Sequence, residues 1–264
     1  MKIDLVMWTK DGEKTLVPCL KSIERAIGQD QVNQKIAVDG HSKDSTRTIL
    51  KQFGWTVYNA EKVGIPFQAK QAISLVETPF FASFEQDIIL NPQWFRLALR
   101  HFYEKENVAV VQGVRVSLNK ILKVIEASAL NKKIRHSSID NNLYRTDIIK
   151  SLDLPLKYPL GFDRALQDLV LDKGFKWIVD KQLVSLHNKQ SFMQDAKKIC
   201  NDVTRCKYMR DNVPFFRVLK LFCFSWVRGF QMGLKSKYPL VIFAYPYYRW
   251  QSVKAYFRNP TKEN

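Results

Sequence analysis

Short apolar runs alternate with stretches of helical periodicity over the first two-thirds of the chain, and this alternation restricts the fold more than any other feature. Runs of strand length begin at Ile3, Lys35, Trp55, Phe80 and Val108. Between the first two runs, leucine and isoleucine recur at helical spacing within residues 16–27. Such alternation is typical of an α/β domain. We therefore expect a mostly parallel, doubly wound sheet with helices on both faces.

The last part of the chain, residues 189–264, departs from this rhythm. It holds 15 Lys and Arg against 4 Asp and Glu, in a chain whose net charge is +17. A single helix over residues 214–235 would place four cations within an arc of about 80°, and they are Arg217, Lys220, Arg228 and Lys235. Charges interrupt the apolar residues too often for a membrane span. We therefore expect a helical appendage whose four cations face an anionic membrane surface. The alternative is that its apolar face packs on the α/β domain or on a second subunit.

The amino terminus runs directly into a strand-like segment and lacks the apolar core and cleavage site of a signal peptide. We therefore expect a cytoplasmic protein, held at the inner membrane face by residues 189–264. The four cysteines show neither a Cys-x-x-Cys pair nor zinc-finger spacing, so we expect buried thiols.

The segment Phe80 to Phe84 ends in the triplet Glu85-Gln86-Asp87. In open α/β sheets, ligands bind beyond the carboxyl ends of the strands. Carboxylate oxygens suit Mg²⁺ or Mn²⁺, and an ion held by one or two carboxylates usually completes its shell with substrate phosphates. The triplet thus predicts a metal-assisted site for a phosphorylated or nucleotide-linked substrate. The alternative is a solvated loop after a buried strand.

Polar loops also follow the first two strands, at Thr9 to Glu13 and Val38 to Thr46. Neither matches a Walker A loop or a Gly-x-Gly-x-x-Gly fingerprint, so a glycine loop of those kinds is not expected to cradle the phosphates. Asp39 directly follows a strand and is placed to accept a hydrogen bond from a base N–H, which is worth about 1.5 to 3 kcal/mol. The alternative roles are a turn for Asp39 and a helix cap for Asp44.

These loops, the Glu85-Gln86-Asp87 triplet and the later Gly161-Phe162-Asp163 together resemble family 2 glycosyltransferases of the GT-A fold, over about residues 2–188. The resemblance implies a catalytic domain over residues 1–188, with a nucleotide-sugar-binding half (1–118) and an acceptor-side half (119–188). It also implies roles in donor binding. They fall on Thr9, Asp11 and Glu13 near the base and ribose, on Asp39 at the base, on Lys70 at a phosphate and on Glu85 at the ribose.

The same resemblance implies that Asp87 binds the metal and that His187, directly after the last expected strand, reaches the metal or the diphosphate. Asn142 and Arg145 match the acceptor-side stretch. Asp163 matches the general base at the mouth of a helix, although Phe162 replaces the usual Glu. The alternatives without a function in the reaction are an N-cap for Asp163, an exposed helical lysine for Lys70 and a structural role for His187.

The function implied is a metal-assisted, inverting transfer of a hexose from a UDP or GDP sugar to a glycan or a lipid-linked acceptor, with Mg²⁺ or Mn²⁺ as the cofactor. The sequence does not decide between a hydroxyl acceptor, which needs a base, and a polyprenyl phosphate, which is already ionised. Two alternatives are a basic nucleic-acid-binding protein on an α/β scaffold and a related sugar nucleotidyltransferase. We expect no nucleic acid partner.

Overall fold

The structure of the protein, a computed structural model, describes residues 1–130, 137–158, 161–189, 191–205 and 214–257. The chain forms two compact units. The first comprises residues 1–115 and 135–188, and the second comprises residues 116–134 and 189–264.

An eight-stranded sheet runs through the first unit in the order β3-β2-β1-β4-β7-β6-β8-β5. Its strands are β1 Ile3–Thr9, β2 Val32–Asp39, β3 Thr56–Asn59, β4 Phe80–Glu85, β5 Ile88–Ile89, β6 Val108–Ser117, β7 Asn142–Arg145 and β8 Lys176–His187. The pairs among β1 to β4 are parallel, whereas β7 is antiparallel to both β4 and β6, and β5 is antiparallel to β8. The prediction of a mostly parallel sheet is therefore wrong. The sheet is mixed because β7 runs opposite to both of its neighbours, starting at Asn142 between Ser83 of β4 and Gln112 of β6.

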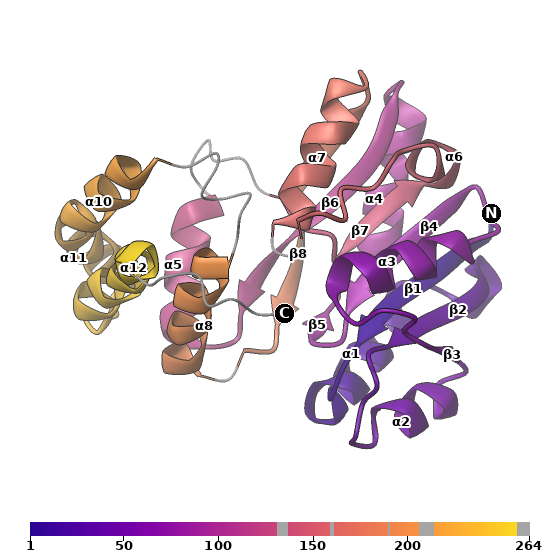
Figure 1. The fold of residues 1–264 in the computed structure, drawn as a ribbon, viewed down its shortest axis with the longest axis horizontal. Coiled ribbons are helices and arrows are strands. Elements are labelled where there is room, and N and C mark those ends of the chain that lie inside the picture. The colour runs from indigo at the N-terminus through magenta and orange to yellow at the C-terminus, as the bar shows by residue number, and fades with distance from the viewer. Residues whose placement is uncertain (131–136, 159–160, 190, 206–213, 258–264) are drawn as a thin grey trace. The chain divides into compact units, whose positions relative to one another are not determined.

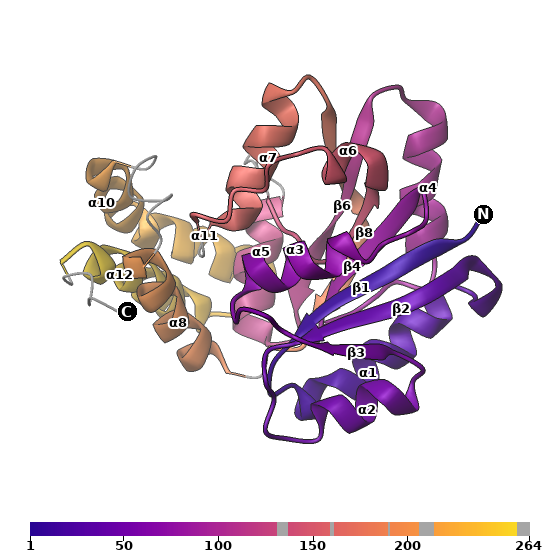
Figure 2. The ribbon, with the colours of Figure 1, turned by 45° about the vertical axis from the view of Figure 1, so that its right-hand side comes forward.

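Helices cover both faces of the parallel half (Figures 1 and 2). Alternate side chains of β1 enter two separate cores, with Leu5 and Met7 in one and Val6 and Trp8 in the other, as the two-residue period of a strand requires. The first core takes side chains from α1, α2 and α4, and the second takes them from α3, α6 and α7. These helices are α1 Glu13–Ala26, α2 Thr46–Gln52, α3 Ile65–Ser74, α4 Trp94–Glu104, α6 Thr146–Lys150 and α7 Phe162–Asp172, and a short 3-10 helix spans Gln29–Gln31.

The pattern of residues 174–179 and 183–186 in the sequence predicts two closing strands. The chain instead forms one strand, β8, that ends at His187. The cysteine expectation holds for Cys19, which is fully buried, and fails for Cys223, which is exposed.

The second unit is helical, with α5 Lys120–Leu130, α8 Phe192–Arg205, α10 Phe215–Cys223, α11 Ser225–Ser236 and α12 Val241–Phe257. Its small core joins Ile125 to Met232, Val241 and Tyr245. Helices α11 and α12 approach closely at Gly229, where an added Cβ would lie 2.8 Å from a backbone oxygen of α12. Within the described ranges, none of the helices combines the length and the apolar character that a membrane span requires.

The single helix expected over residues 214–235 is in fact two helices that meet at Phe224. The backbone of Phe224 has ψ 0°, away from the helical mean, and the hydroxyl of Ser225 donates to the carbonyl of Phe222 on α10. A side-chain hydroxyl that competes for backbone groups in this way favours a helix end. The four cations are therefore divided, with Arg217 and Lys220 on α10 and the other two on α11.

Candidate functional site

The carboxyl ends of the parallel strands bring the first predicted residues together. Thr9 of β1 lies opposite Asp39 of β2 in the strand register, and the neighbouring Trp8 lies opposite Glu85 of β4. Asp39 is completely buried and accepts hydrogen bonds from Thr9 Oγ1 at 3.2 Å, from the Ser42 backbone N–H at 2.9 Å and from Arg47 Nη1 at 3.2 Å. Its carboxylate therefore holds the turn after β2 in place, directly at the sheet edge.

The loops after β1 and β2 are fastened to each other through the two other predicted acids. Asp11 Oδ1 accepts from the backbone N–H of Lys43 at 2.8 Å, and Glu13 Oε2 accepts from that of Ser45 at 3.1 Å. Asp11 has a positive φ of 47°, which asparagine and aspartate tolerate better than most residues. Both carboxylates thus shape the edge of the site.

Gln86, the middle residue of the triplet, has a role that sequence reasoning did not assign. Its side-chain amide accepts from the backbone N–H of Lys10 and donates to the carbonyl of the same residue, both at 3.0 Å. This pair of bonds, called the Gln86–Lys10 clasp below, joins the loop after β1 to the loop after β4. The clasp also explains the glycine at position 12, where an added Cβ would lie 2.4 Å from Gln86 Oε1.

We expect Gly12→Ala to displace the Gln86 amide and to lower the free energy of unfolding by about 1 to 2 kcal/mol, since two hydrogen bonds are lost. Urea unfolding of Gly12→Ala, Gln86→Ala and the double variant measures the effect. The two changes should not add, because each removes the same clasp. Fully additive losses would show that Gly12 acts by another route.

A cluster of three candidate metal ligands lies beside this clasp. Ligand atoms of Glu85, Asp87 and His187 all lie within 4.8 Å of one another. His187 Nε2 lies 2.8 Å from Asp87 Oδ2, and the backbone N–H of Asn188 donates to the Asp87 carbonyl at 2.8 Å. The structure therefore brings together the two acids and the histidine that the sequence separates by about a hundred positions.

Strand pairing explains how His187 reaches the acidic triplet. The two-residue strand β5 follows Asp87 and pairs antiparallel with β8, so that Ile88 lies opposite His187. The imidazole is buried, and its Nδ1 has no hydrogen-bond partner within the described part of the chain. Buried polar atoms are normally satisfied. An orphaned Nδ1, on an imidazole whose Nε2 faces Asp87, is consistent with a ligand that binds at this ring.

This donor set fits a divalent cation. Two carboxylates and one imidazole are acceptable to Mn²⁺ or Mg²⁺, and about a quarter of each acidic side chain stays exposed, 26% for Glu85 and 29% for Asp87. The exposed side leaves room for the phosphate oxygens that such an ion usually recruits from a substrate.

Arg115 of β6 connects this cluster to Asp163 electrostatically. Its Nη1 lies 3.6 Å from Glu85 Oε2 and 2.6 Å from Asp140 Oδ2, and Asp140 is almost fully buried. Asp163 lies in the first turn of α7 and accepts from Ser137 Oγ at 3.2 Å. Sequence reasoning missed both Arg115 and Asp140, because neither belongs to a short motif.

The surroundings of Asp163 shift its pKa. Burial raises its pKa above the ordinary aspartate value, against the lowering effects of the Arg164 backbone N–H, the Arg115 charge and the Ser137 hydroxyl. A raised pKa brings a carboxylate closer to the working range of an acid-base catalyst. Gly161, which precedes α7 with a left-handed φ of 84°, sets the angle at which this turn begins.

A comparison with known protein families identifies the family of this chain. Residues 4–158, more than half of the chain, match the family model described as glycosyl transferase family 2. The chain belongs to glycosyl transferase family 2. The resemblance noted in the sequence is thereby confirmed, and membership makes the protein a glycosyltransferase. A search among curated proteins found no match.

The fold of this glycosyltransferase is GT-A-like, as solved structures show. Glucosyl-3-phosphoglycerate synthase from Mycobacterium tuberculosis, in complex with Mn²⁺, UDP and phosphoglyceric acid, aligns with a TM-score of 0.57 at 16% identity, over 78% of each chain. S. aureus TarS 1–349, in complex with UDP-GlcNAc, aligns with a TM-score of 0.56 at 16% identity, over 97% of this chain and 89% of that chain.

Phe162, where this glycosyltransferase departs from the family pattern, is a core residue. Its side chain is 3% exposed and packs in the core that includes Trp8, Phe81 and Tyr144. A carboxylate at this position would be buried without a partner, which is costly. The departure therefore changes packing below the site and leaves Asp163 as the carboxylate of this turn.

The two predicted acceptor-side residues, Asn142 and Arg145, contact other parts of the protein. Asn142 is fully buried and its amide donates to Ser138 O and to the Tyr144 hydroxyl. Arg145 lies opposite Phe80 at the start of β4, the end of the strand remote from Glu85, and its guanidinium is 5.9 Å from the centre of the Phe80 ring. We therefore leave Arg145 out of the proposed site.

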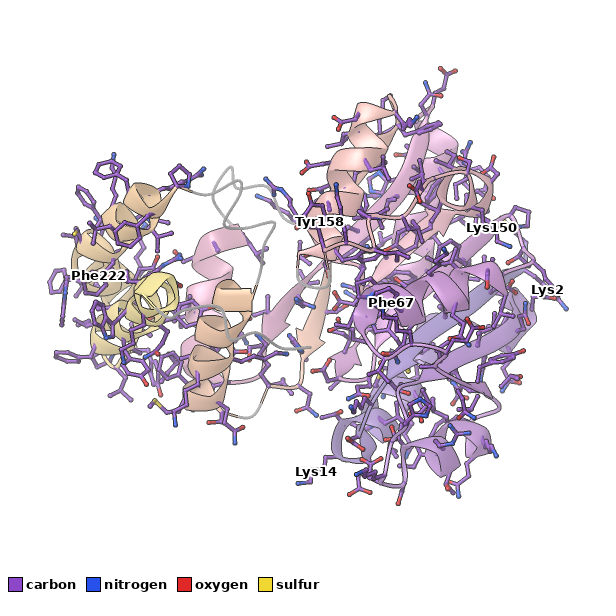
Figure 3. The ribbon with its side chains drawn as sticks, viewed as in Figure 1. Lys2, Lys14, Phe67, Lys150, Tyr158 and Phe222 are labelled. Atoms are coloured by element: carbon purple, nitrogen blue, oxygen red, sulfur yellow. The ribbon has the colours of Figure 1, made fainter. Side chains whose placement is uncertain are left out.

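Lys70 lies on the exposed face of α3, beside a hollow of about 280 Å³ that Lys62 and Phe67 also line. Phe67 is labelled in Figure 3. Two positions earlier on the same helix, Gln68 turns inward and donates to Thr9 O at 3.2 Å and to Val38 O at 3.0 Å. The helix thus reaches the strand ends through Gln68, a contact that sequence reasoning did not predict.

Proposed function

We propose that this glycosyltransferase moves a hexose from a UDP or GDP sugar to a hydroxyl group of a glycan or lipid-linked acceptor, with inversion and with Mg²⁺ or Mn²⁺. The observation that carries the proposal is the gathering of Glu85, Asp87 and His187 within 4.8 Å at the carboxyl edge of the sheet. The solved structures of similar fold contain UDP with Mn²⁺ or UDP-GlcNAc, which favours UDP as the first nucleotide to test.

In the proposed mechanism, the loops after β1 and β2 form the nucleotide side of the site. Asp39 and Thr9 lie beneath the base, while Asp11 and Glu13 keep the two loops together. Asp87 and His187 would hold the ion, with Glu85 toward the ribose. When bound, the ion would stabilise the negative charge that develops on the departing diphosphate.

Asp163 is the residue that we propose as general base. It removes the proton of the acceptor hydroxyl while that oxygen attacks the anomeric carbon, and a single carboxylate suffices for such an inverting displacement. Its raised pKa supports a hydroxyl acceptor, since a polyprenyl phosphate is already ionised near neutral pH. Asn142 and Lys70 remain proposals for the acceptor and phosphate sides.

We also propose that the protein lies at the cytoplasmic face of the inner membrane. Arg217, Lys220 and Lys235 are exposed, and Arg228 is half-buried. Exposed aromatic side chains such as Phe216 and Trp226 accompany them on α10 and α11. Aromatic and cationic side chains on one helical surface are typical of helices in a membrane interface.

Arg115 should matter for both stability and transfer. Removing it leaves the buried Asp140 carboxylate without its 2.6 Å partner, so Arg115→Gln should lower the free energy of unfolding by about 2 to 3 kcal/mol. Adding Asp140→Asn should restore most of that loss, which urea unfolding would measure. Transfer should stay impaired in the double variant if the Arg115 charge acts on the site itself. Recovery of transfer together with stability would limit Arg115 to a structural role.

Calorimetric titration of UDP, GDP and their common sugar conjugates, with and without Mn²⁺, tests the proposed function. Metal-dependent binding of one nucleotide supports the donor site and identifies the base. A folded protein that binds none of these ligands, with or without metal, would contradict the proposal.

A further inference from the structure

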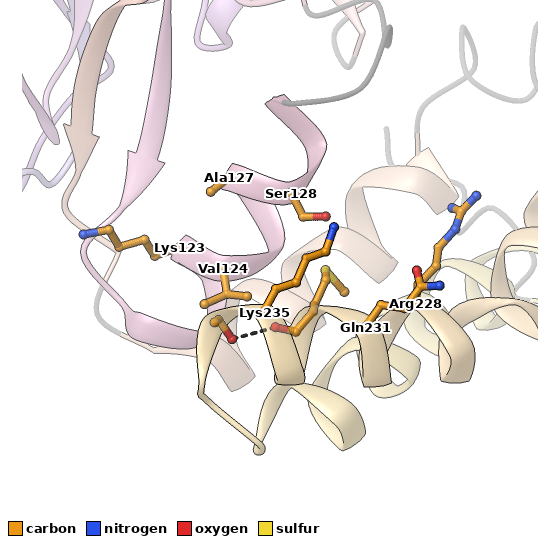
Figure 4. A pocket seen from close by; sticks show the side chains of 9 residues that line it. Lys123, Val124, Ala127, Ser128, Arg228, Gln231 and Lys235 are labelled. Carbon is orange, nitrogen blue, oxygen red and sulfur yellow. Dashed lines mark hydrogen bonds between the residues drawn. The ribbon is translucent and has the colours of Figure 1, made fainter.

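The helical unit contains a pocket that is lined by none of the residues proposed for donor binding, metal binding or proton transfer. It lies between α5 and α11, is lined mainly by apolar atoms and has a volume of about 490 Å³. Figure 4 shows Lys235 extending along it toward Ser128, with Arg228 on the other side, while the ammonium group of Lys123 points away. Volumes of this size are typical of sites for small ligands. The pocket therefore offers an apolar lining with two cations beside it.

Two arginines converge on one phenol next to this pocket. Arg249 Nε donates to the Tyr245 hydroxyl at 3.0 Å, and Arg228 also hydrogen bonds this side chain. Burial would raise the pKa of Tyr245, but the charges of Arg249 and Arg228 bring it below its usual value. Two half-buried guanidinium groups on neighbouring helices thus share one phenol as a partner.

No acidic side chain is available nearby in the sequence to balance them. From Pro214 to Phe257 the chain has seven Lys and Arg and no Asp or Glu. The ion pairs that the described residues of this unit form join Lys189 to Glu126 and to Asp195, and leave Arg228, Lys235 and Arg249 out. Cations that form no ion pair among the described residues, two of them half-buried, favour an anionic ligand.

The exposed surface of residues 216–243 indicates what kind of molecule carries the anion. Eight large apolar side chains are more than half exposed, and they are Phe216, Phe224, Trp226, Val227, Phe230, Leu234, Leu240 and Phe243. Apolar surface of this extent marks an interaction site. Aromatic residues mixed with cations match the interface of an anionic bilayer, where phosphate groups lie next to acyl chains.

We propose that the pocket between α5 and α11 is a binding site for the phosphate of an anionic phospholipid, whose chains lie along the apolar lining. Arg228 and Lys235 contact the phosphate, and Arg249 stays on the Tyr245 hydroxyl, which leaves Arg228 most of its five donors for the ligand. The inference rests on the membrane contact proposed above and adds a defined site to it.

Vesicle binding of two charge-matched variants tests the site. The pocket variant is Arg228→Gln with Lys235→Gln, and the control is Lys197→Gln with Lys198→Gln on α8, which also removes two positive charges from the helical unit at exposed side chains. Binding is measured by co-sedimentation with phosphatidylcholine vesicles that contain phosphatidylglycerol, at low salt and at about 0.5 M salt, where diffuse attraction is largely screened.

At high salt we expect the control variant to bind like the wild type and the pocket variant to bind at least about fivefold more weakly, because a desolvated ion pair is screened less than an exposed one. Equal binding of the two variants would overturn the site and leave only diffuse attraction. A wild type that binds no vesicles at all would overturn the membrane contact as well. Neither result bears on nucleotide binding, which the calorimetric titration measures separately.

A second variant tests the pocket without changing charge. Ala127 on α5 lines the pocket, so Ala127→Phe should fill it. Ala129 lies on the same helix and does not line the pocket, so Ala129→Phe is the control. We expect Ala127→Phe alone to weaken binding, with both variants retaining the thermal transition of the wild type. Equal binding of the two variants would overturn the site.

A soluble short-chain phosphatidylglycerol separates lipid from free phosphate. We expect it to compete with vesicles at concentrations at which inorganic phosphate does not. If inorganic phosphate competes equally well, the pocket binds free phosphate and the lipid assignment is wrong.

Discussion

Asp87→Ala is expected to remove metal-dependent binding of the donor nucleotide, with a loss of at least about 100-fold in affinity in the presence of Mn²⁺. Loss of an outer partner of a metal ligand already costs about 10- to 100-fold, and Asp87 is proposed to bind the ion directly. Its carboxylate lies 2.8 Å from His187 Nε2, so the substitution also leaves that buried imidazole without its acidic neighbour.

Calorimetry with and without Mn²⁺ measures this effect, and Asp172→Ala, at the exposed end of α7, is the matched control. The control should bind the nucleotide like the wild type. Unchanged metal dependence in Asp87→Ala would remove Asp87 from the metal site and direct attention to Glu85.

Asp163→Asn is expected to lower transfer to a hydroxyl acceptor by about 1000-fold, within the range of 10² to 10⁴ that a general base contributes, and to leave nucleotide binding unchanged. The wild-type rate should fall on the acid side at a pH above 3.8, the ordinary aspartate value, because burial raises the pKa of this carboxyl group. Asp168→Asn on the same helix should retain activity, since its partner there is Arg164 at 4.0 Å.

The same substitution should raise the thermal stability near neutral pH. A carboxyl group whose pKa is higher in the folded state stabilises the fold while it is protonated, and this contribution is lost as the pH rises through the folded-state value. Asparagine is neutral throughout, so the stability difference should shrink as the pH falls and Asp163 takes up its proton.

Two results would contradict the base role of Asp163. One is full transfer to a hydroxyl acceptor by the variant. The other is a variant that is less stable than the wild type at neutral pH, which would assign Asp163 a structural role. Transfer that survives only with a polyprenyl phosphate acceptor would instead identify an acceptor that needs no base.

Much of the parallel half of the sheet could be predicted because its signals are local. Residues that form β1, β4 and α1 carry the period of their own element, and a strand followed by acids at residues 85 and 87 indicates the edge where a ligand binds. The antiparallel half could not be predicted, because the direction of β7 depends on where the chain re-enters the sheet. The break at Phe224 was missed for a similar reason, since apolar periodicity continues across it.

The sequence by itself determined the family, the alternation of strands and helices, and the identity of Thr9, Asp39, Asp87 and Asp163 as polar residues at element ends. Tertiary structure decided which of them meet. The pairing of β5 with β8 brings His187 to Asp87, Arg115 joins Glu85 to the buried Asp140, and two guanidinium groups converge on Tyr245. Apart from Arg249 and Tyr245, which lie one helical turn apart on α12, these contacts join residues that are far apart in the sequence. Hydrogen bonds and ion pairs act over a few ångströms in space and not along the chain, so sequence neighbours carry no sign of such partners.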